Sequence, residues 1–388
     1  MGNQESGDPM SLAIVDAREW QRVLDLETGQ KVERDGPVLQ MMKGVLQRHP
    51  YPGDTAAGSG AWVTDTALDL IEQYDPGFVS LSYAHLYFSA RFMSVSEVER
   101  KAMVLGLFEE IARFVKASGF TPVVLGTGGM TPLVDVIDLS RLDGLALCTL
   151  WSARYCGLHG PSDQDMDAVA RHPWVERIVA RQEFLTLFGG TATDGLRLPD
   201  FILVSRPGYG FKAAGVPLRR TVNVSAPSFS IPLHQGLGEV RSLTEICGLI
   251  EREIGNRRIA LIHVEGVGES EFPWPYTPCS NGREWYYYEP SEAQYLAATT
   301  GKHQVFAFPV GARLFDDDSE NEPYPFSGYF NRVPDGTVGQ RLSVRSMAVG
   351  NRSMFPHMVY GADVSIECFA RNLYNQGCTG VIHRDDKA

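Results

Sequence analysis

The chain has 388 residues and a formal net charge of -12. Hydrophobic residues make up 44% and charged residues 21% of the sequence, which are values of an ordinary globular protein and argue against long disorder. No apolar run reaches the roughly 18 to 20 residues that a membrane-spanning helix needs. The negative charge and the absence of a dense basic run disfavour nucleic acid and anionic membranes as partners.

The N-terminal residues and the cysteines predict a cytoplasmic protein. Residues 1–9 are polar and lack the basic and then apolar order of a secretory signal. The cysteines are scattered without a CxxC pair, so neither a disulfide scaffold nor a zinc site is indicated. We expect reduced thiols at all six positions: Cys148, Cys156, Cys247, Cys279, Cys368 and Cys378.

Helices and strands alternate after a preface of about 60 residues. The preface, residues 1–60, holds a short apolar stretch and a helical segment, and it ends in a loop rich in Pro and Gly. Residues 65–71 have helical spacing and precede a strand at 78–83. Residues 96–117 predict an amphipathic helix that ends at Gly119.

The pattern predicts an α/β fold with a mostly parallel sheet covered by helices on both faces. Buried strands are expected at 123–125, 200–204 and 258–264. The less regular segment 136–195 is interpreted as a small cap insert, which leaves residues 61–135 and 196–305 as the core. We expect residues 306–388 to form an irregular region packed on that core.

Several segments resemble the alkaline phosphatase superfamily, in particular its nucleotide pyrophosphatase/phosphodiesterase branch. Residues 123–132 read VVLGTGGMTP, residues 85–91 read HLYFSAR, and residues 199–211 read PDFILVSRPGYGF. The resemblance implies an alkaline-phosphatase-like sheet with two divalent ions held by Asp and His side chains. Thr127 and Gly128 stand at one such pair of positions, and Tyr87 and Arg91 at another. Because these residues cannot hold metal ions, we expect no metal and a fold reused for binding or other chemistry.

The order of the motifs suggests a circular permutation. The strand that opens the family fold, with its metal-binding Asp and then Gly, is most similar to residues 262–268, IHVEGVG. The helix that carries the family nucleophile resembles residues 290–303, which lie downstream. A strand at 259–264 placed at the sheet edge, far from the strand at 123–125, would contradict this order.

The best candidates for catalysis lie near the end of the strand at 258–264. His263 and Glu265 alternate along it and should point to one face at its carboxyl end. They are interpreted as a base with its partner, as ligands of one ion, or as a pair that bonds nearby backbone. Cys279 or Ser280 could be a nucleophile that His263 or His303 activates, although an inert, partly buried cysteine explains Cys279 as well.

Candidate binding residues come from the glycine-rich loop, the loop at 85–91 and an aromatic segment. Backbone amides at Thr127 and Gly128 could hold an anion, while plain turns explain the glycines equally. His85 and Arg91 belong to the second loop of the resemblance. Trp285 begins an aromatic run that suits either a ligand platform or packing on the sheet.

Three functions follow. The leading prediction is an alkaline-phosphatase-like fold without the two-metal site that acts in binding or assembly, with a small anionic ligand or a protein partner and with homo-oligomers allowed. The alternative is a hydrolase or transferase on a small phosphorylated or acyl substrate, for which a divalent metal would be a cofactor only if its ligands are re-sited around His263 and Glu265. The third is a subunit of a larger complex that uses the aromatic C-terminal third. Whether the chain is an enzyme stays open.

Overall fold

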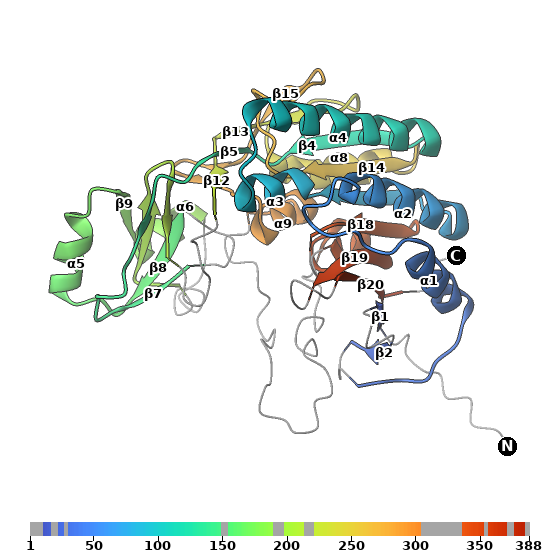
Figure 1. Cartoon of the computed structure of the whole chain (residues 1–388), viewed down its shortest axis with the longest axis horizontal. Coiled ribbons are helices and arrows are strands. Elements are labelled where there is room, and N and C mark those ends of the chain that lie inside the picture. The colour runs from blue at the N-terminus through green and yellow to red at the C-terminus, as the bar shows by residue number, and fades with distance from the viewer. Residues whose placement is uncertain are drawn as a thin grey trace.

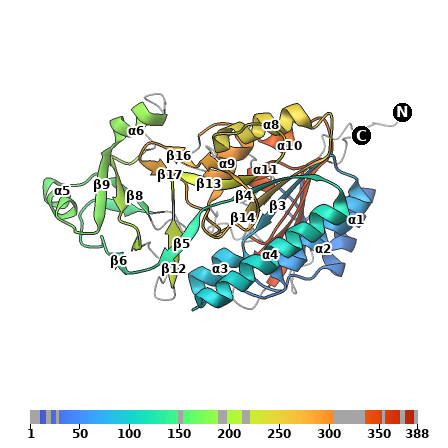
Figure 2. The same ribbon diagram turned by 90° about the horizontal axis from the view of Figure 1, so that it is seen from above.

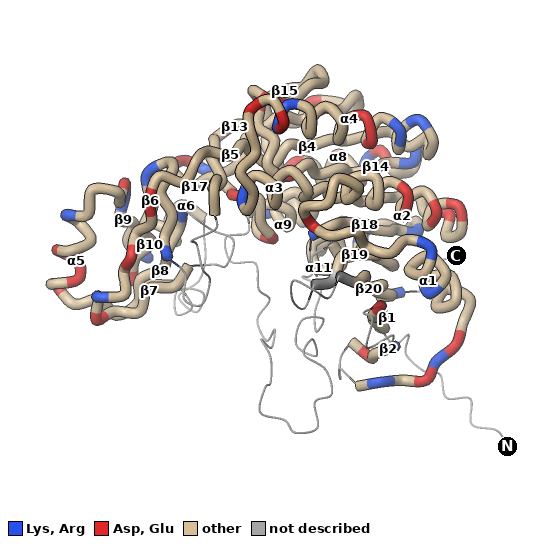
Figure 3. The backbone as a smooth tube through the Cα atoms, viewed as in Figure 1, with Lys and Arg blue, Asp and Glu red and all other residues tan. Residues whose placement is uncertain are grey.

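The computed structural model describes residues 11–16, 22–26, 30–148, 154–188, 198–212, 221–303, 336–352, 356–370 and 376–384. These residues form an α/β body and a smaller inserted β-rich unit at one end of it (Figure 1). In the part of the chain described, no helix is both long enough and apolar enough to cross a membrane. Acidic and basic residues both occur in the two units (Figure 3).

The body is built on a ten-stranded sheet within the described residues. Its five central strands pair in parallel, and antiparallel strands flank them on both sides. In spatial order the strands are β15 (Thr277–Ser280), β13 (Ser230–His234), β4 (Thr121–Gly126), β14 (Ile259–Val264), β3 (Phe78–Tyr83), β18 (Ser346–Gly350), β19 (Val364–Ala370), β20 (Gln376–Ile382), β1 (Leu12–Asp16) and β2 (Arg22–Asp25).

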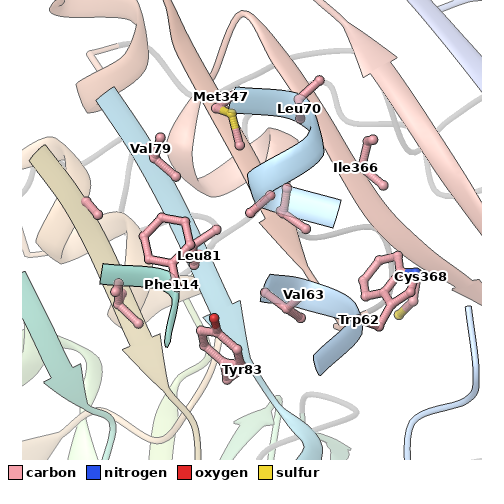
Figure 4. Packing of buried hydrophobic residues seen from close by; sticks show 14 of the residues in the cluster. Trp62, Val63, Leu70, Val79, Leu81, Tyr83, Phe114, Met347, Ile366 and Cys368 are labelled. Atoms are coloured by element: carbon pink, nitrogen blue, oxygen red, sulfur yellow. The ribbon is translucent and has the colours of Figure 1, made fainter. Parts of the chain in front are cut away.

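Helices cover both faces of this sheet (Figure 2). Alternate strand residues feed two separate cores, so Ile262 packs under one layer of helices and Leu261 under the other. The first layer contains α1 (Pro37–Arg48), α2 (Ser59–Tyr74) and α4 (Glu97–Ser118), and the second contains α8 (Ile246–Glu253), α9 (Glu292–Thr300), α10 (Val338–Arg341) and α11 (Pro356–Tyr360). Figure 4 shows Trp62, Leu70 and Phe114 of the first layer packed over the central strands.

Local sequence explains the longest helix. Ser96 caps α4, because its side chain accepts from the Glu99 amide while the Glu99 carboxylate accepts from the Ser96 amide. The helix ends where Gly119 adopts φ 69, a left-handed conformation that glycine adopts without a steric penalty. The prediction of a helix over residues 96–117 with Gly119 at its end is therefore confirmed.

The inserted unit is a four-stranded antiparallel sheet with a helix against each face. Its strands are β7 (Leu145–Leu147), β8 (Tyr155–His159), β10 (Phe201–Ser205) and β9 (Val175–Ala180), and its helices are α5 (Asp163–Ala170) and α6 (Arg181–Phe188). Two ribbons join it to the body, one formed by β5 (Gly129–Pro132) with β12 (Asn223–Ala226) and the other by β6 (Asp135–Ile137) with β11 (Tyr209–Phe211). The remaining elements are α3 (His85–Phe92), η2 (Leu243–Glu245), β16 (Gly282–Arg283) and β17 (Tyr286–Tyr287).

Three sequence predictions need correction. The sheet is parallel only at its centre, because β13, β15, β20, β1 and β2 join it antiparallel. The strand predicted at 200–204 exists as β10, but it lies in the insert, which therefore extends beyond residue 195. The region 306–388, predicted to be irregular, supplies β18, β19 and β20 to the main sheet.

The composition of β18 explains why residues 306–388 were wrongly predicted to be irregular, because the residues of this strand are mostly small. Gly350 lies so close to β3 that a Cβ atom there would clash with the Ser82 hydroxyl oxygen. Close packing between central strands thus selects residues that carry little strand signal in the sequence. The preface also contributes to the sheet, since β1 pairs with β20.

Candidate functional site at the carboxyl edge of the parallel strands

The central parallel strands end at one edge of the sheet, and the residues that follow them meet there. Glu265 follows β14 and donates its amide to Tyr83 O at 2.9 Å, while Thr127 follows β4 and donates to Val264 O at 3.1 Å. Arg352 follows β18 and reaches the same place. Ligand sites of α/β sheets form at this edge, so it is the place where chemistry is expected.

Glu265 is completely buried, and both of its carboxylate oxygens are engaged. Arg352 Nη1 donates to Oε2 at 2.6 Å, and the Tyr295 hydroxyl donates to Oε1 at 2.6 Å. Burial raises the pKa of Glu265, and the Arg352 guanidinium opposes that rise. Arg352 is 2% exposed and also donates to Pro290 O at 3.1 Å. The carboxylate therefore ties the loop after β14 to the loop after β18 and to α9.

His263 points to the same face as Glu265, as its place two residues earlier on the strand predicts. Its ring stacks on Tyr295 with centroids 4.1 Å apart, and Nδ1 lies 2.9 Å from the Tyr360 hydroxyl. Burial lowers the pKa of His263 to about 3, so the imidazole is neutral at pH 7. Nε2 has no hydrogen-bond partner among the described residues, and neither has the Ser82 hydroxyl on the neighbouring strand.

The two loops that the resemblance assigned to metal ligands do not fit a divalent cation. Arg91 Nη1 donates to the Tyr87 hydroxyl at 2.6 Å, and the Arg352 guanidinium carbon lies 5.5 Å from the centroid of the same ring. Two guanidinium groups so placed repel a cation. Gly266, at φ 78, brings the loop after β14 against Tyr87, where a Cβ would stand 3.2 Å from Tyr87 Cα. Within the described ranges, no group of three or more His, Cys, Asp and Glu side chains could hold a metal ion.

The glycine-rich loop after β4 uses its amides internally. Gly128 N donates to Val267 O at 3.1 Å, as Thr127 N does to Val264 O, so neither is directed at an anion. The Thr127 hydroxyl accepts from Gly266 N at 3.1 Å. Gln294 Nε2 donates to Thr127 O at 3.0 Å and to Asn281 Oδ1 at 2.7 Å, which fixes the orientation of its amide. Anion binding by the amides of Thr127 and Gly128 would require these bonds to break.

The structure does not bring the proposed nucleophiles to His263. Cys279 lies on edge strand β15, separated from β14 by β13 and β4, or about 14 Å at the usual strand spacing. It is fully buried, and burial raises its pKa to about 12, so a thiolate is disfavoured. The Ser280 hydroxyl donates to Gly282 O at 3.3 Å.

The other predicted residues also lie in packing positions. His303 Nδ1 lies 3.3 Å from the Tyr288 hydroxyl, and burial lowers its pKa. Trp285 packs on the insert, where its ring lies near Phe184 with centroids 6.3 Å apart. His85 Nδ1 lies 3.2 Å from Asp54 O. None of these contacts tests the predicted roles in catalysis or binding, which stay predictions.

The aromatic segment 284–288 fastens the insert to the body. Tyr155 of β8 stacks on Tyr286 with centroids 4.7 Å apart. The Tyr155 hydroxyl donates to Tyr287 O at 2.9 Å and accepts from Tyr287 N at 3.0 Å. Tyr288 is completely buried. Much of the aromatic surface that was predicted to bind a partner therefore packs between the insert and the body of the same chain.

Sequence reasoning missed the partners of His263 and Glu265. Arg352 and Tyr295 are 87 and 30 residues from Glu265 in the chain, and Tyr360 is 97 residues from His263. The segment 290–303 offered one signal, because Tyr295 stands in a helix of mostly small residues. The position of Arg352 carried no such signal, since its region was interpreted as irregular.

Exposed apolar side chains lie outside this buried cluster, where the body passes into the insert. Phe92 is 42%, Met93 45%, Val134 65% and Val222 37% exposed. Val222 N donates to Arg91 O at 2.7 Å and Val222 O accepts from Leu133 N at 2.9 Å, so the three segments adjoin. Both views show α3 beside β5 and β12 (Figures 1 and 2). We call these four residues the apolar rim.

No protein-family model and no curated protein matches the chain. Among solved structures, it is similar to the crystal structure of phosphonoacetate hydrolase from Sinorhizobium meliloti 1021 in complex with phosphonoformate, at 13% identity and a TM-score of 0.34. The likeness covers 53% of this chain and 55% of that chain, so the chain spans about half the length of that structure. A likeness of this size does not assign a family, and the superfamily resemblance stays a prediction.

The permuted order also stays a prediction. β14 lies at the centre of the sheet and pairs directly with β4, so the arrangement that would have contradicted the permutation does not occur.

Proposed function

We propose that this protein acts in binding or assembly, and that a second copy of the chain binds at the apolar rim. The observation that carries the proposal is the exposure of Phe92, Met93, Val134 and Val222 on adjoining segments. Contiguous exposed apolar groups mark interaction surfaces, and Phe and Met are enriched in them.

The burial of the polar groups at the carboxyl edge also supports the proposal. A general base must exchange a proton with a substrate and therefore must reach it. His263 and Glu265 are completely buried, Tyr295 and Arg352 occupy both carboxylate oxygens of Glu265, and the Tyr360 hydroxyl lies at Nδ1 of His263. An engaged ion pair of this kind holds loops together, and nothing in its geometry favours the hydrolase or transferase alternative.

Analytical ultracentrifugation of the full chain over a concentration series tests the proposal. We expect the wild-type chain to self-associate and the double variant Met93→Ser/Val134→Ser to raise the dissociation constant at least tenfold. The matched control is Leu145→Ser/Leu147→Ser, which removes two side chains of 57% and 50% exposure from the insert and should leave association unchanged. A wild-type chain that stays monomeric, or equal losses in both double variants, would contradict the proposal.

A hydrolysis assay separates the enzyme alternative. The chain is incubated with a chromogenic phosphomonoester and a phosphodiester, each with and without zinc or manganese. Turnover that requires His263, shown by its loss in His263→Phe while the variant stays folded, would establish the alternative and overturn the binding proposal.

A further inference from the structure

The insert brings two cysteines together at one end of a strand pair. β7 and β8 are antiparallel, with Leu145 opposite His159 and Leu147 opposite Gly157. Continuing this register by one residue sets Cys148 opposite Cys156, whose own Sγ donates to Gly157 O at 3.7 Å. Facing residues in antiparallel strands have Cβ atoms about 4.5–5.5 Å apart, and a disulfide needs about 3.5–4.5 Å, so the two strand ends must approach each other slightly for the bond to form.

The two thiols differ in access and in acidity. Cys148 is partly exposed, whereas Cys156 is 2% exposed in the core of the insert. The neighbouring Cys156 thiol lowers the pKa of Cys148, and the neighbouring Cys148 together with burial raises the pKa of Cys156. An accessible thiol with a lowered pKa beside a second thiol is the arrangement that oxidant-sensitive sites share.

We propose that Cys148 and Cys156 form an oxidisable dithiol site that closes to a disulfide in the presence of a hydroperoxide. The Cys148 thiolate attacks the terminal peroxide oxygen, which breaks the O–O bond, gives a sulfenic acid and releases water or an alcohol. Cys156 then attacks the Cys148 sulfur, forms the S–S bond and expels the second water. Both thiols lose one hydrogen, and the hydroperoxide is the species reduced.

A second cysteine pair in the body serves as an internal control. Cys368 and Cys378 also face each other, on β19 and β20, but both are completely buried. Their thiols donate to Asp54 Oδ1 at 3.8 Å and to His49 O at 3.5 Å, so complete burial is what distinguishes them from Cys148. Burial also raises the pKa of Cys378. Facing positions alone therefore do not make an oxidisable site, and this pair should stay reduced.

The disulfide would form beside the contact that holds the insert to the body. Tyr155 precedes Cys156 directly, and it is the residue that stacks on Tyr286 and bonds Tyr287. Joining the ends of β7 and β8 should restrain this junction. Oxidation is therefore expected to raise the thermal unfolding midpoint of the wild-type chain and to leave that of Cys148→Ser unchanged.

Peptide mapping of the full chain tests the site. The folded protein is treated with hydrogen peroxide, free thiols are alkylated, and trypsin is added without reductant. The expected product links peptide 142–154 to peptide 155–171, because Arg154 separates the two cysteines. Peptides 353–371 and 372–384, which carry Cys368 and Cys378, should stay unlinked.

Single variants test the order of steps. In Cys156→Ser, the sulfenic acid on Cys148 should persist and react with dimedone. In Cys148→Ser, Cys156 should remain alkylatable after the same treatment. Failure of the 142–154 and 155–171 peptides to link, equal linking of the buried pair, or primary oxidation of Cys156 would each overturn the proposal.

Discussion

The carboxyl edge and the apolar rim lie close together and are built in opposite ways. At the edge, charged and polar groups such as Glu265, Arg352 and His263 are at most 2% exposed. At the rim, Phe92 and Met93 are more than two-fifths exposed. A catalytic cleft needs its polar groups where a substrate can reach them, and this arrangement places them inside and places apolar surface outside. The difference shows that polar residues at strand ends can stabilise the fold while the neighbouring apolar surface binds a partner.

The largest effect expected from this comparison is on stability when Arg352 is replaced. Arg352→Met leaves the Glu265 carboxylate buried without its cation, which should lower the free energy of unfolding by about 3–5 kcal/mol. The matched control is Arg113→Met, whose exposed ion pairs with Asp65 and Glu110 should contribute about 0–1 kcal/mol. Urea unfolding measures both changes. Equally small losses of unfolding free energy in Arg352→Met and Arg113→Met would show that the buried ion pair does not stabilise the fold.

A smaller loss is expected when the hydroxyl on Tyr295 is removed. Tyr295→Phe keeps the ring stacked on His263 and deletes the bond to the Glu265 carboxylate, which should lower the free energy of unfolding by about 1.5–3 kcal/mol. Tyr360→Phe deletes a bond to a neutral imidazole and should cost about 1 kcal/mol. The two variants are compared in one denaturant series, and a larger loss in Tyr360→Phe would refute the ranking.

A pH dependence similar in size to the Tyr295→Phe loss is expected from His263. Burial lowers its folded-state pKa to about 3, below the value near 6.5 of an unfolded chain. The unfolded chain therefore binds the proton first, and stability present above about pH 6.5 is lost as the pH falls toward 3. Between pH 7 and pH 5 the loss should be roughly 2 kcal/mol.

His263→Phe isolates this contribution, because every other titrating group is common to both chains. Urea unfolding at pH 7 and pH 5 should show that the wild-type chain loses roughly 2 kcal/mol more than the variant. An identical pH dependence in the two chains would mean that His263 is not held neutral in the fold.

The sequence predicts the parts of this molecule that depend on local pattern. The helix at α4, the strand at β14 and the shared face of His263 and Glu265 follow from spacing and capping. These features need only residues that are close in the chain.

What the sequence could not predict depends on register and on distant contacts. Arg352 meets Glu265 only because β18 lies beside β3 at the sheet centre, and the small residues of β18 hide that strand in the sequence. Cys148 and Cys156 face each other because of the pairing of β7 with β8. The placement of Cys279 away from His263 depends on the order of four strands.

The central claim is that Glu265 and Arg352 form a cohesive pair and not a catalytic one, and a double-mutant cycle tests it most directly. Unfolding free energies are measured for the wild-type chain, Glu265→Gln, Arg352→Met and the double variant. We expect each single variant to lose several kcal/mol and the double variant to lose less than the sum of the two, because no buried charge is left unpaired. Replacing a residue that serves activity often makes the fold more stable. A Glu265→Gln chain that is as stable as the wild type, or more stable, would therefore contradict a stabilising role of the pair.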